Sequence, residues 1–229
     1  MANKQKFTLF HTVDDGFLRD WHLPYAQVFK QCKKVVDLGC GPGVFLDLLR
    51  ENGIYGIGLD IDSTVVSQAK ERGHEAAVAT DKEIAKFSPG ADGIHISHVI
   101  EYLWGDDLLS LLKTCASSLN PGGALIVRTP NWGNPNVSGG GFWDDYTHKR
   151  PYSLIQLTRL FEDLGLVITA QGFEPFGWGD TYVIGRKPRL DGQEIPADQL
   201  IWSPRFLQKP YIRRRDRPRL WLKRWLLGE

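Results

Sequence analysis

VVDLGCGPG (35–43) is the stretch of sequence that decides the fold. The apolar run KKVVDLG (33–39) is typical of a buried strand, and it ends in glycines. VFLDLLRENG (44–53) follows, with its leucines and phenylalanine on one face of a predicted helix. This order of strand, glycine-rich turn and helix indicates an α/β fold in which a helix begins at the edge of a sheet.

The same alternation continues along the chain. Predicted strands lie at 33–39, 54–60, 75–80, 92–100 and 124–129, and helical patterns lie at 44–53, 63–72 and 106–119. Because strands joined by helical crossovers run parallel, the pattern predicts a doubly wound α/β sheet. Two further β-rich runs, 166–173 and 181–186, predict an antiparallel pair at the end of the sheet.

Composition sets the broad class of protein. The chain has 229 residues, of which 42% are hydrophobic and 24% charged, so we expect one domain with additions. Cys32, Cys40 and Cys115 form no Cys-x-x-Cys pair, which argues against a disulfide framework or a zinc cluster. The sequence shows no signal-peptide core and no run of about 18 apolar residues that would span a bilayer. We therefore expect a cytoplasmic protein.

The chain divides into three predicted parts. Residues 1–32 form an N-terminal helical cap, whose helical pattern is interrupted at Pro24. Residues 33–186 form the main domain, in which the Gly-, Asn- and Pro-rich stretch 130–152 is interpreted as a substrate loop. Residues 187–229 form a basic, aromatic C-terminal extension.

The glycine turn carries the strongest chemical signal. Glycines let a ligand approach the backbone closely, and N–H groups at a helix start attract a carboxylate or phosphate. Asp60 follows Gly39 by twenty-one residues, at the end of the second strand, where it is placed to accept hydrogen bonds from ribose hydroxyls. A dinucleotide site would want a third glycine where this chain has Val44. This difference disfavours NAD or FAD.

The ordered set of motifs resembles the class I S-adenosylmethionine-dependent methyltransferases. The resemblance is carried by VVDLGCGPG (35–43), GLDID (58–62), Thr80-Asp81, SHVIEYL (97–103), LNPGGALIVRTPN (119–131) and the closing hairpin. It covers about residues 33–186. It implies a Rossmann-like, seven-stranded, doubly wound sheet with its last strand antiparallel, and S-adenosyl-L-methionine as the cofactor.

The resemblance also implies roles for individual residues. The expected cofactor-binding residues are Gly39, Cys40 and Gly41 at the methionine end, Asp60 at the ribose, Ile61 on the adenine ring, Asp81 at the adenine amino group, Ser97 and His98 beneath the sulfonium, and Asp37, which would order the glycine turn.

A hydroxyl acceptor for methyl transfer needs a proton acceptor nearby, and His148 is our candidate because an imidazole titrates near neutral pH. THKRPYSLIQLTRLFEDLGL (147–166) resembles a segment of the ubiquinone-biosynthesis O-methyltransferases and of methyltransferases acting on sugars of bacterial polysaccharides. In those relatives a histidine lies at the acceptor site. The alternative role for His148 is a hydrogen bond to backbone that closes the loop.

The loop also contains several aromatic residues, among them Trp143 and Tyr146. Such rings suit a sugar or a quinol precursor as the acceptor, and they equally suit anchoring of the loop.

No metal site is expected. Many relatives have Glu-His where this chain has Glu101-Tyr102, and one RNA-methylating branch ligates a metal through that pair. Tyrosine is not a typical ligand for a divalent metal, so Tyr102 argues against such a site.

The formal charge of +1 is a sum over unlike parts. Residues 205–229 contain nine Lys and Arg against two Asp and Glu, with Trp and Leu interleaved, whereas residues 1–204 contain 19 basic and 25 acidic residues. The tail could dock on the domain or a partner subunit, bind an anionic membrane as a peripheral protein at its inner face, or contact RNA phosphates. Nucleic acid ranks last of the three, and all three remain open.

The leading hypothesis is an S-adenosylmethionine-dependent methyltransferase that O-methylates a saccharide or small hydroxylated acceptor. One alternative is an RNA or N-methyltransferase. The other is a non-catalytic, methyltransferase-like partner of another enzyme.

Overall fold

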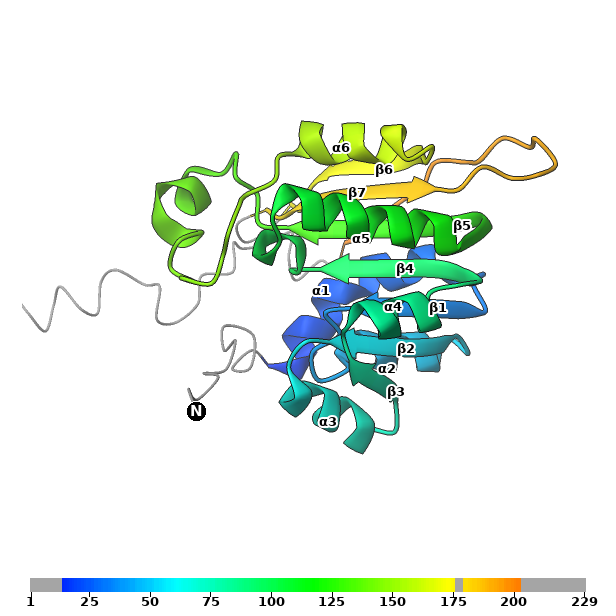
Figure 1. Ribbon diagram of the computed structural model, residues 1–229, viewed down its shortest axis with the longest axis horizontal. Coiled ribbons are helices and arrows are strands. Elements are labelled where there is room, and N and C mark those ends of the chain that lie inside the picture. Colours follow the sequence, from blue (N-terminus) through cyan, green and yellow to red (C-terminus); the bar gives the residue numbers. More distant parts are fainter. Residues whose placement is uncertain (1–13, 176–178, 203–229) are drawn as a thin grey trace, which may run out of the picture.

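The computed structural model describes residues 14–175 and 179–202. Its seven strands form one sheet in the order β3-β2-β1-β4-β5-β7-β6 (Figure 1). The strands are β1 (Lys34–Leu38), β2 (Tyr55–Asp60), β3 (Glu75–Val78), β4 (Ala91–Ser97), β5 (Leu119–Thr129), β6 (Val167–Phe173) and β7 (Thr181–Arg186). β1 to β5 pair in parallel, and β7 pairs antiparallel with β5 and β6. The predicted Rossmann-like sheet with an antiparallel last strand is confirmed.

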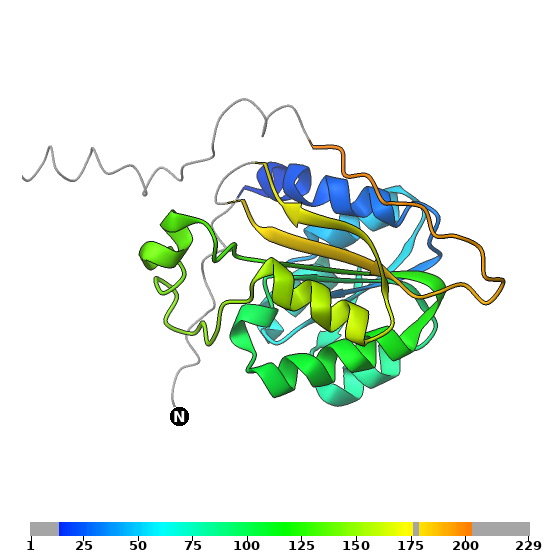
Figure 2. The ribbon, with the colours of Figure 1, turned by 90° about the horizontal axis from the view of Figure 1, so that it is seen from above.

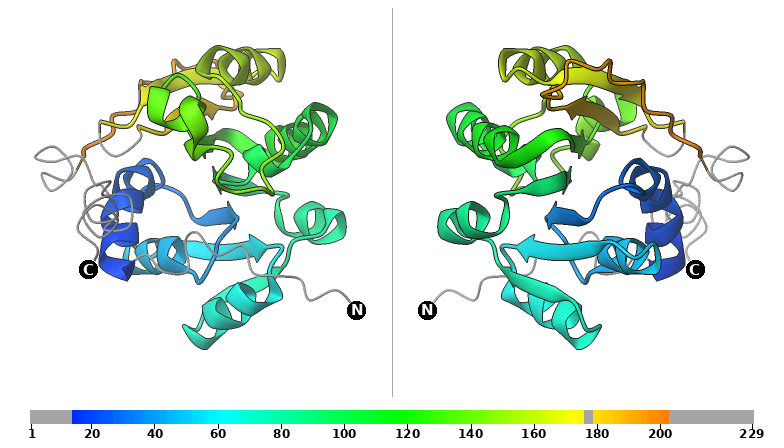
Figure 3. Two further views of the ribbon diagram at one scale, coloured as in Figure 1. Left: turned by 90° about the vertical axis from the view of Figure 1, so that its left-hand side faces the viewer. Right: turned by 90° about the vertical axis from the view of Figure 1, so that its right-hand side faces the viewer.

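Helices cover both faces of this sheet (Figure 3). They are α1 (Asp15–Val28), α2 (Val44–Glu51), α3 (Ser63–Glu71), α4 (Asp81–Phe87), α5 (Gly105–Ser118) and α6 (Leu154–Asp163). α1 and α2 pack with one apolar cluster, and α5 and α6 pack with another on the opposite face. Strands with both faces covered are apolar throughout, which explains the continuous apolar runs in the sequence.

Two elements differ from the sequence prediction. The predicted interruption at Pro24 is wrong, because α1 runs through Pro24. Buried Phe17, Leu18 and Tyr25 hold this helix by packing, which offsets the hydrogen bond that proline cannot donate. α4 was not predicted; its start is marked by Thr80, whose hydroxyl accepts the backbone N–H of Glu83.

β5 also starts earlier than the predicted strand 124–129. Leu119 is its first residue, although the residues Asn120-Pro121-Gly122-Gly123 are typical of a turn. The backbone N–H of Gly122 donates to Lys187 O at 2.8 Å, and Lys187 N–H donates to Gly123 O at 2.9 Å. Pairing with a segment far away in the sequence therefore extends the strand through the turn residues.

The predicted substrate loop 130–152 lies beyond the carboxyl ends of the parallel strands (Figures 1 and 2). It contains a short π-helical turn, Val137–Gly141. The loop ends at α6, which begins with a capping box. The Ser153 hydroxyl accepts the N–H of Gln156, and the Gln156 side chain accepts the N–H of Ser153.

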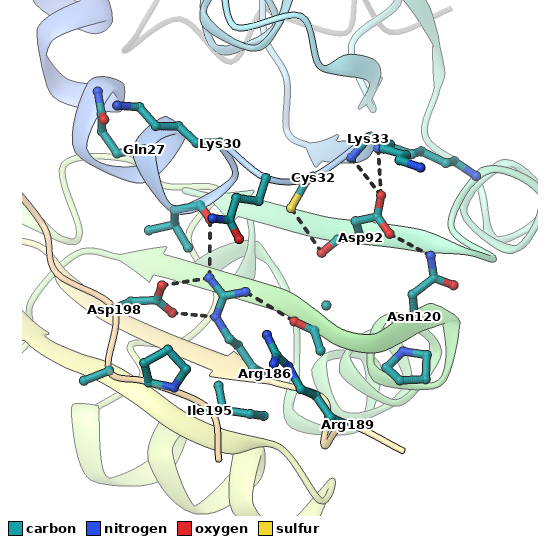
Figure 4. Close-up of a pocket in the computed structure, with 18 of the residues that line it drawn as sticks. Gln27, Lys30, Cys32, Lys33, Asp92, Asn120, Arg186, Arg189, Ile195 and Asp198 are labelled. Atoms are coloured by element: carbon teal, nitrogen blue, oxygen red, sulfur yellow. Dashed lines mark hydrogen bonds and ion pairs between the residues drawn. The ribbon is translucent and has the colours of Figure 1, made fainter. Parts of the chain in front are cut away.

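The segment after β7 packs back on the domain. Asp198 binds Arg186 through two contacts of 2.7 and 2.8 Å, and Trp202 packs against Tyr25 with ring centroids 5.8 Å apart. This segment borders a pocket of about 960 Å³ at the amino-terminal edge of the sheet (Figure 4). There Asp92 accepts hydrogen bonds from the backbone of Lys33 at 2.8 Å. The predicted basic tail, 205–229, lies outside the described residues.

Candidate active site

The glycine turn joins β1 to α2 and leaves one side of its backbone open. Gly39 and Gly41 have φ of 81° and 51°, which only glycine adopts without strain. A Cβ at Gly39 would lie 2.4 Å from Val99 Cγ2. A Cβ at Gly41 would meet no atom of the described residues within 4 Å. A ligand can therefore approach the backbone at Gly41.

Asp60 lies beside this opening, as its position at the end of β2 predicted. Its carboxylate accepts the N–H of Gly41 and the N–H of Asp62, each at 2.9 Å and each on a different oxygen. Burial raises the pKa of Asp60, and the two N–H donors oppose that shift. Each oxygen keeps a lone pair for a further donor such as a hydroxyl. The next residue, Ile61, is 71% exposed, which leaves an apolar surface next to the carboxylate.

Cys40 and Asp37 point into the protein. Cys40 is buried, with its Sγ 2.7 Å from where a Cβ on Gly58 would lie, and burial raises the pKa of its thiol. The Cys40 backbone N–H donates to Leu59 O at 3.2 Å, so the contact of Cys40 with the cofactor stays a prediction. Asp37 is 2% exposed, and its carboxylate lies 2.7 Å from Nδ1 of His95 on β4. Asp37 thus contacts the neighbouring strand, and its expected role in ordering the turn stays a prediction.

The other predicted cofactor residues stand at the ends of β3 and β4. Asp81 is the first residue of α4, and its contact with adenine stays a prediction. Ser97 ends β4 with its carbonyl 3.2 Å from where a Cβ on Gly39 would lie, so it is next to the glycine turn.

His98 follows Ser97 with φ 54°, the one left-handed non-glycine residue among those described. Its Nδ1 lies 3.1 Å from Glu101 Oε1, and its Nε2 lies 2.7 Å from Asp180 Oδ2. Burial alone would lower the pKa of His98, but these two carboxylates raise it to about 9. His98 is therefore an imidazolium at neutral pH, and both ring nitrogens donate.

A buried charged cluster next to His98 was missed by sequence reasoning. Arg128 on β5 is fully buried, and its Nη2 lies 2.8 Å from Glu174 and 3.3 Å from Asp180. Glu174 also accepts from Trp21 Nε1 and the Tyr25 hydroxyl of α1, each at 2.6 Å. Burial raises the pKa of Glu174 to about 7, while Arg128 acts to lower it. The one sequence signal was an arginine inside the apolar run ALIVRT (124–129).

The loop residue His148 is oriented by backbone. Its Nδ1 lies 2.6 Å from Phe142 O, and its Nε2 lies 3.8 Å from Asp145 Oδ2. A carbonyl only accepts, so Nδ1 carries the proton and, in the neutral ring, Nε2 keeps its lone pair. A backbone hydrogen bond from Lys149 N–H to Glu101 O, at 2.9 Å, joins this loop to the residues after β4. Tyr146, 83% exposed, is an aromatic that faces solvent.

The described part of the chain shows no group of three or more His, Cys, Asp or Glu placed to hold a metal ion. Glu101 instead lies between His98 and the Thr129 hydroxyl, which donates to its second oxygen at 3.1 Å.

Among the described residues, none of the helices combines the length and the apolar character that a membrane span requires.

These features are those of a methyltransferase domain. The chain matches the methyltransferase-domain family over residues 10–171 and belongs to that family. The resemblance to class I S-adenosylmethionine-dependent methyltransferases is thereby confirmed.

Similar proteins support the same assignment. The chain is 29% identical over 113 residues to a ubiquinone biosynthesis O-methyltransferase of Xanthomonas campestris, covering 46% of each chain. It is 34% identical over 101 residues to a trans-aconitate 2-methyltransferase of Rhodopseudomonas palustris, covering 43% of this chain and 39% of that protein. The matches thus span less than half the length of these relatives. A SAM-dependent methyltransferase structure from Archaeoglobus fulgidus has a TM-score of 0.69 at 25% identity, covering 79% of this chain and 98% of that one.

Proposed function

We propose that this protein is an S-adenosylmethionine-dependent methyltransferase that O-methylates a saccharide or another small hydroxylated acceptor. The main support for this cofactor is the contact between Gly41 and Asp60. The backbone at Gly41 is open to a ligand, the Asp60 carboxylate has free lone pairs, and the neighbouring Ile61 is exposed. Asp60 would accept the ribose hydroxyls, and Ile61 would pack on the adenine. When bound, the cofactor supplies a methyl group activated by a sulfonium sulfur.

The chain's own contribution to catalysis is positioning and proton transfer. His148 Nε2 would take the proton of the acceptor hydroxyl, since Nδ1 is held by Phe142 O. Glu101 and Asp180 hold the His98 imidazolium in one orientation at the end of β4, next to the glycine turn.

The surface of the loop supports a ring-bearing acceptor. Trp143 and Tyr146 are 52% and 83% exposed, and Asp144 beside them is exposed as well. Exposed aromatic rings next to carboxylates suit a neutral sugar or a quinol precursor better than an RNA phosphate backbone. The ubiquinone-biosynthesis relatives are named as O-methyltransferases, which favours oxygen as the accepting atom.

The test of this function is transfer of labelled methyl from S-adenosylmethionine into a fractionated cell lysate. We expect label in a saccharide-containing or small-metabolite fraction. Label in RNA or protein alone would favour the RNA or N-methyltransferase alternative. Tight binding of S-adenosylhomocysteine with no transfer into any fraction would favour the non-catalytic partner.

The cofactor assignment has its own test in Asp60→Ala. We expect this variant to bind S-adenosylhomocysteine at least about tenfold more weakly, which is about 1.4 kcal/mol, by titration calorimetry. Asp62→Ala is the matched control, because Asp62 caps α3 through the N–H of Thr64 and should affect helix stability rather than affinity. Unchanged affinity in Asp60→Ala would refute the ribose contact.

A further inference from the structure

The pocket at the amino-terminal edge of the sheet is separate from the candidate active site (Figure 4). Its volume of about 960 Å³ is within the range of pockets that hold small ligands. Lys34, the first residue of β1, lines this pocket, whereas the glycine turn follows Leu38 at the other end of the same strand. A ligand bound here would therefore leave the glycine turn and Asp60 free for the cofactor.

The pocket carries a surplus of positive charge. Five basic side chains line it against two carboxylates, a net formal charge of +3: Lys30, Lys33, Lys34, Arg186 and Arg189 against Asp92 and Asp198. The Cys32 thiol, which also lines the pocket, adds no negative charge, because burial raises its pKa to about 11. A concave surface with one sign of charge concentrates small ions of the opposite sign.

Both carboxylates of the pocket are already bound by the protein. Asp198 accepts from Arg186 on both oxygens, at 2.7 and 2.8 Å. Asp92 accepts two backbone N–H groups, at 2.8 and 3.1 Å, and the side-chain amide of Asn120 at 2.7 Å. These contacts leave the lysines of the pocket without a carboxylate partner among the described residues.

Three basic side chains keep donors for a ligand. Within the described ranges, the ammonium groups of Lys30 and Lys33 form no hydrogen bond or ion pair. Arg189 uses one N–H of Nη1, toward Gln193 Oε1 at 3.2 Å. Lys30 follows α1, Lys33 precedes β1 and Arg189 follows β7, so the donors reach the pocket from three segments (Figure 4).

We propose that this pocket binds a small phosphorylated and hydroxylated metabolite, of which a sugar phosphate is the simplest kind. Lysine and arginine are the side chains that bind phosphate best. A phosphate monoester carries about −1.5 to −2 charges near neutral pH, so it offsets more of the surplus than a single carboxylate does. The amide side chains of Gln27, Gln31 and Gln199 also line the pocket and can pair with hydroxyl groups.

The basic tail, 205–229, would compete with the pocket for phosphate. Its nine Lys and Arg against two Asp and Glu give it the same sign of charge as the pocket, which disfavours the tail as the occupant. The same charge attracts phosphate to the tail itself. A test must therefore locate a phosphate probe on the full chain as well as detect its binding.

The experiment is an NMR titration of the full chain with glucose-6-phosphate, glucose and inorganic phosphate as probes. Glucose-6-phosphate should shift the amide signals of Gly90 and Gly122, which line the pocket, and leave those of Gly41 and Asp60 unchanged. We expect a Kd of about 1 mM or tighter. Glucose should cause no shift, and inorganic phosphate should bind at least about threefold more weakly, because it lacks the sugar hydroxyls that the amides would bind.

Lys33→Glu and Arg189→Glu test the location. Both side chains are exposed, so we expect the fold to stay intact, and unchanged signals of Gly41 and Asp60 report this. Each charge reversal should weaken binding of glucose-6-phosphate at least about fivefold, because it replaces attraction by repulsion. Lys70→Glu is the matched control: this exposed lysine on α3 does not line the pocket, and its reversal should keep the Kd within about twofold.

Three results would overturn the inference. The same Kd in Lys33→Glu, Arg189→Glu and Lys70→Glu would assign the phosphate to the tail or to the general charge of the surface. Glucose or inorganic phosphate binding as tightly as glucose-6-phosphate would show that the pocket does not select a sugar phosphate. The absence of any shift at Gly90 and Gly122 with millimolar probe would show that the pocket does not bind it.

Discussion

At the residue scale, His148 is fixed by one ring nitrogen and keeps the other able to accept a proton. Nδ1 lies 2.6 Å from Phe142 O, which sets the tautomer. If Nε2 is the base, His148→Ala should lower kcat by about 10²-fold or more, with the affinity for S-adenosylhomocysteine kept within about twofold. Steady-state kinetics with the acceptor found by labelled-methyl transfer measures this.

His148→Asn separates proton transfer from loop anchoring. An asparagine amide can replace the Nδ1 donor to Phe142 O, but it takes no proton near neutral pH. We expect turnover in His148→Asn to stay as low as in the alanine variant. Turnover restored by asparagine would make His148 a loop anchor, the alternative that the sequence left open.

Residue types at short spacing indicated the Gly41–Asp60 contact but not the buried charged contacts. Gly41 follows β1 and Asp60 ends the neighbouring strand β2, so one motif and one spacing bring them together. Glu174 meets Trp21 across 153 positions of sequence, and no local pattern indicates that contact. An arginine in a strand shows that a partner is needed without showing which residue supplies it.

At the scale of elements, His98 joins three parts of the fold. It binds Glu101 after β4 and Asp180 before β7, and its ring lies 5.3 Å from that of Trp21 on α1. Its ordinary pKa is 6.5, and despite burial the two carboxylates raise it to about 9 in the folded chain. Between these values the folded state keeps a proton that the unfolded state releases, so stability falls as pH rises.

Thermal unfolding should show this dependence. We expect the Tm to be highest near pH 6.5 within the range 6.5 to 9.5, and to fall as the pH passes through about 9. His98→Gln removes the titrating group and should flatten that part of the curve, whatever its overall stability. A wild-type slope that His98→Gln leaves unchanged would assign the pH dependence to other groups.

Element order was more predictable than element ends. The strand and helix patterns on either side of VVDLGCGPG (35–43) hold because apolar periodicity reports burial directly. β5 begins at Leu119, within a turn-like sequence, because Gly122 and Gly123 pair with Lys187. α1 continues through Pro24 because its apolar face is packed. In both cases tertiary contacts override a local signal, which a single sequence does not show.

At the scale of the whole molecule, the C-terminal extension has two parts. The described segment up to Trp202 belongs to the domain, because the Asp198 backbone N–H donates to Thr169 O at 3.1 Å and Asp198 binds Arg186. The nine basic residues follow later, in 205–229. A shortened chain that ends at Arg189 would therefore remove structural contacts together with the tail.

Two truncations separate these parts. Ending the chain after Arg189 removes the Asp198 ion pair and the packing of Trp202. Because the loss of a fully buried large aromatic side chain costs about 3–5 kcal/mol, we expect the free energy of unfolding to fall by about 2 kcal/mol or more. Ending it after Pro204 should leave urea unfolding unchanged if the tail acts only on a membrane or another molecule. In that case, flotation with anionic liposomes should be lost along with the tail. A loss of stability in the chain ending at Pro204 would instead place the tail on its own domain or on a second subunit.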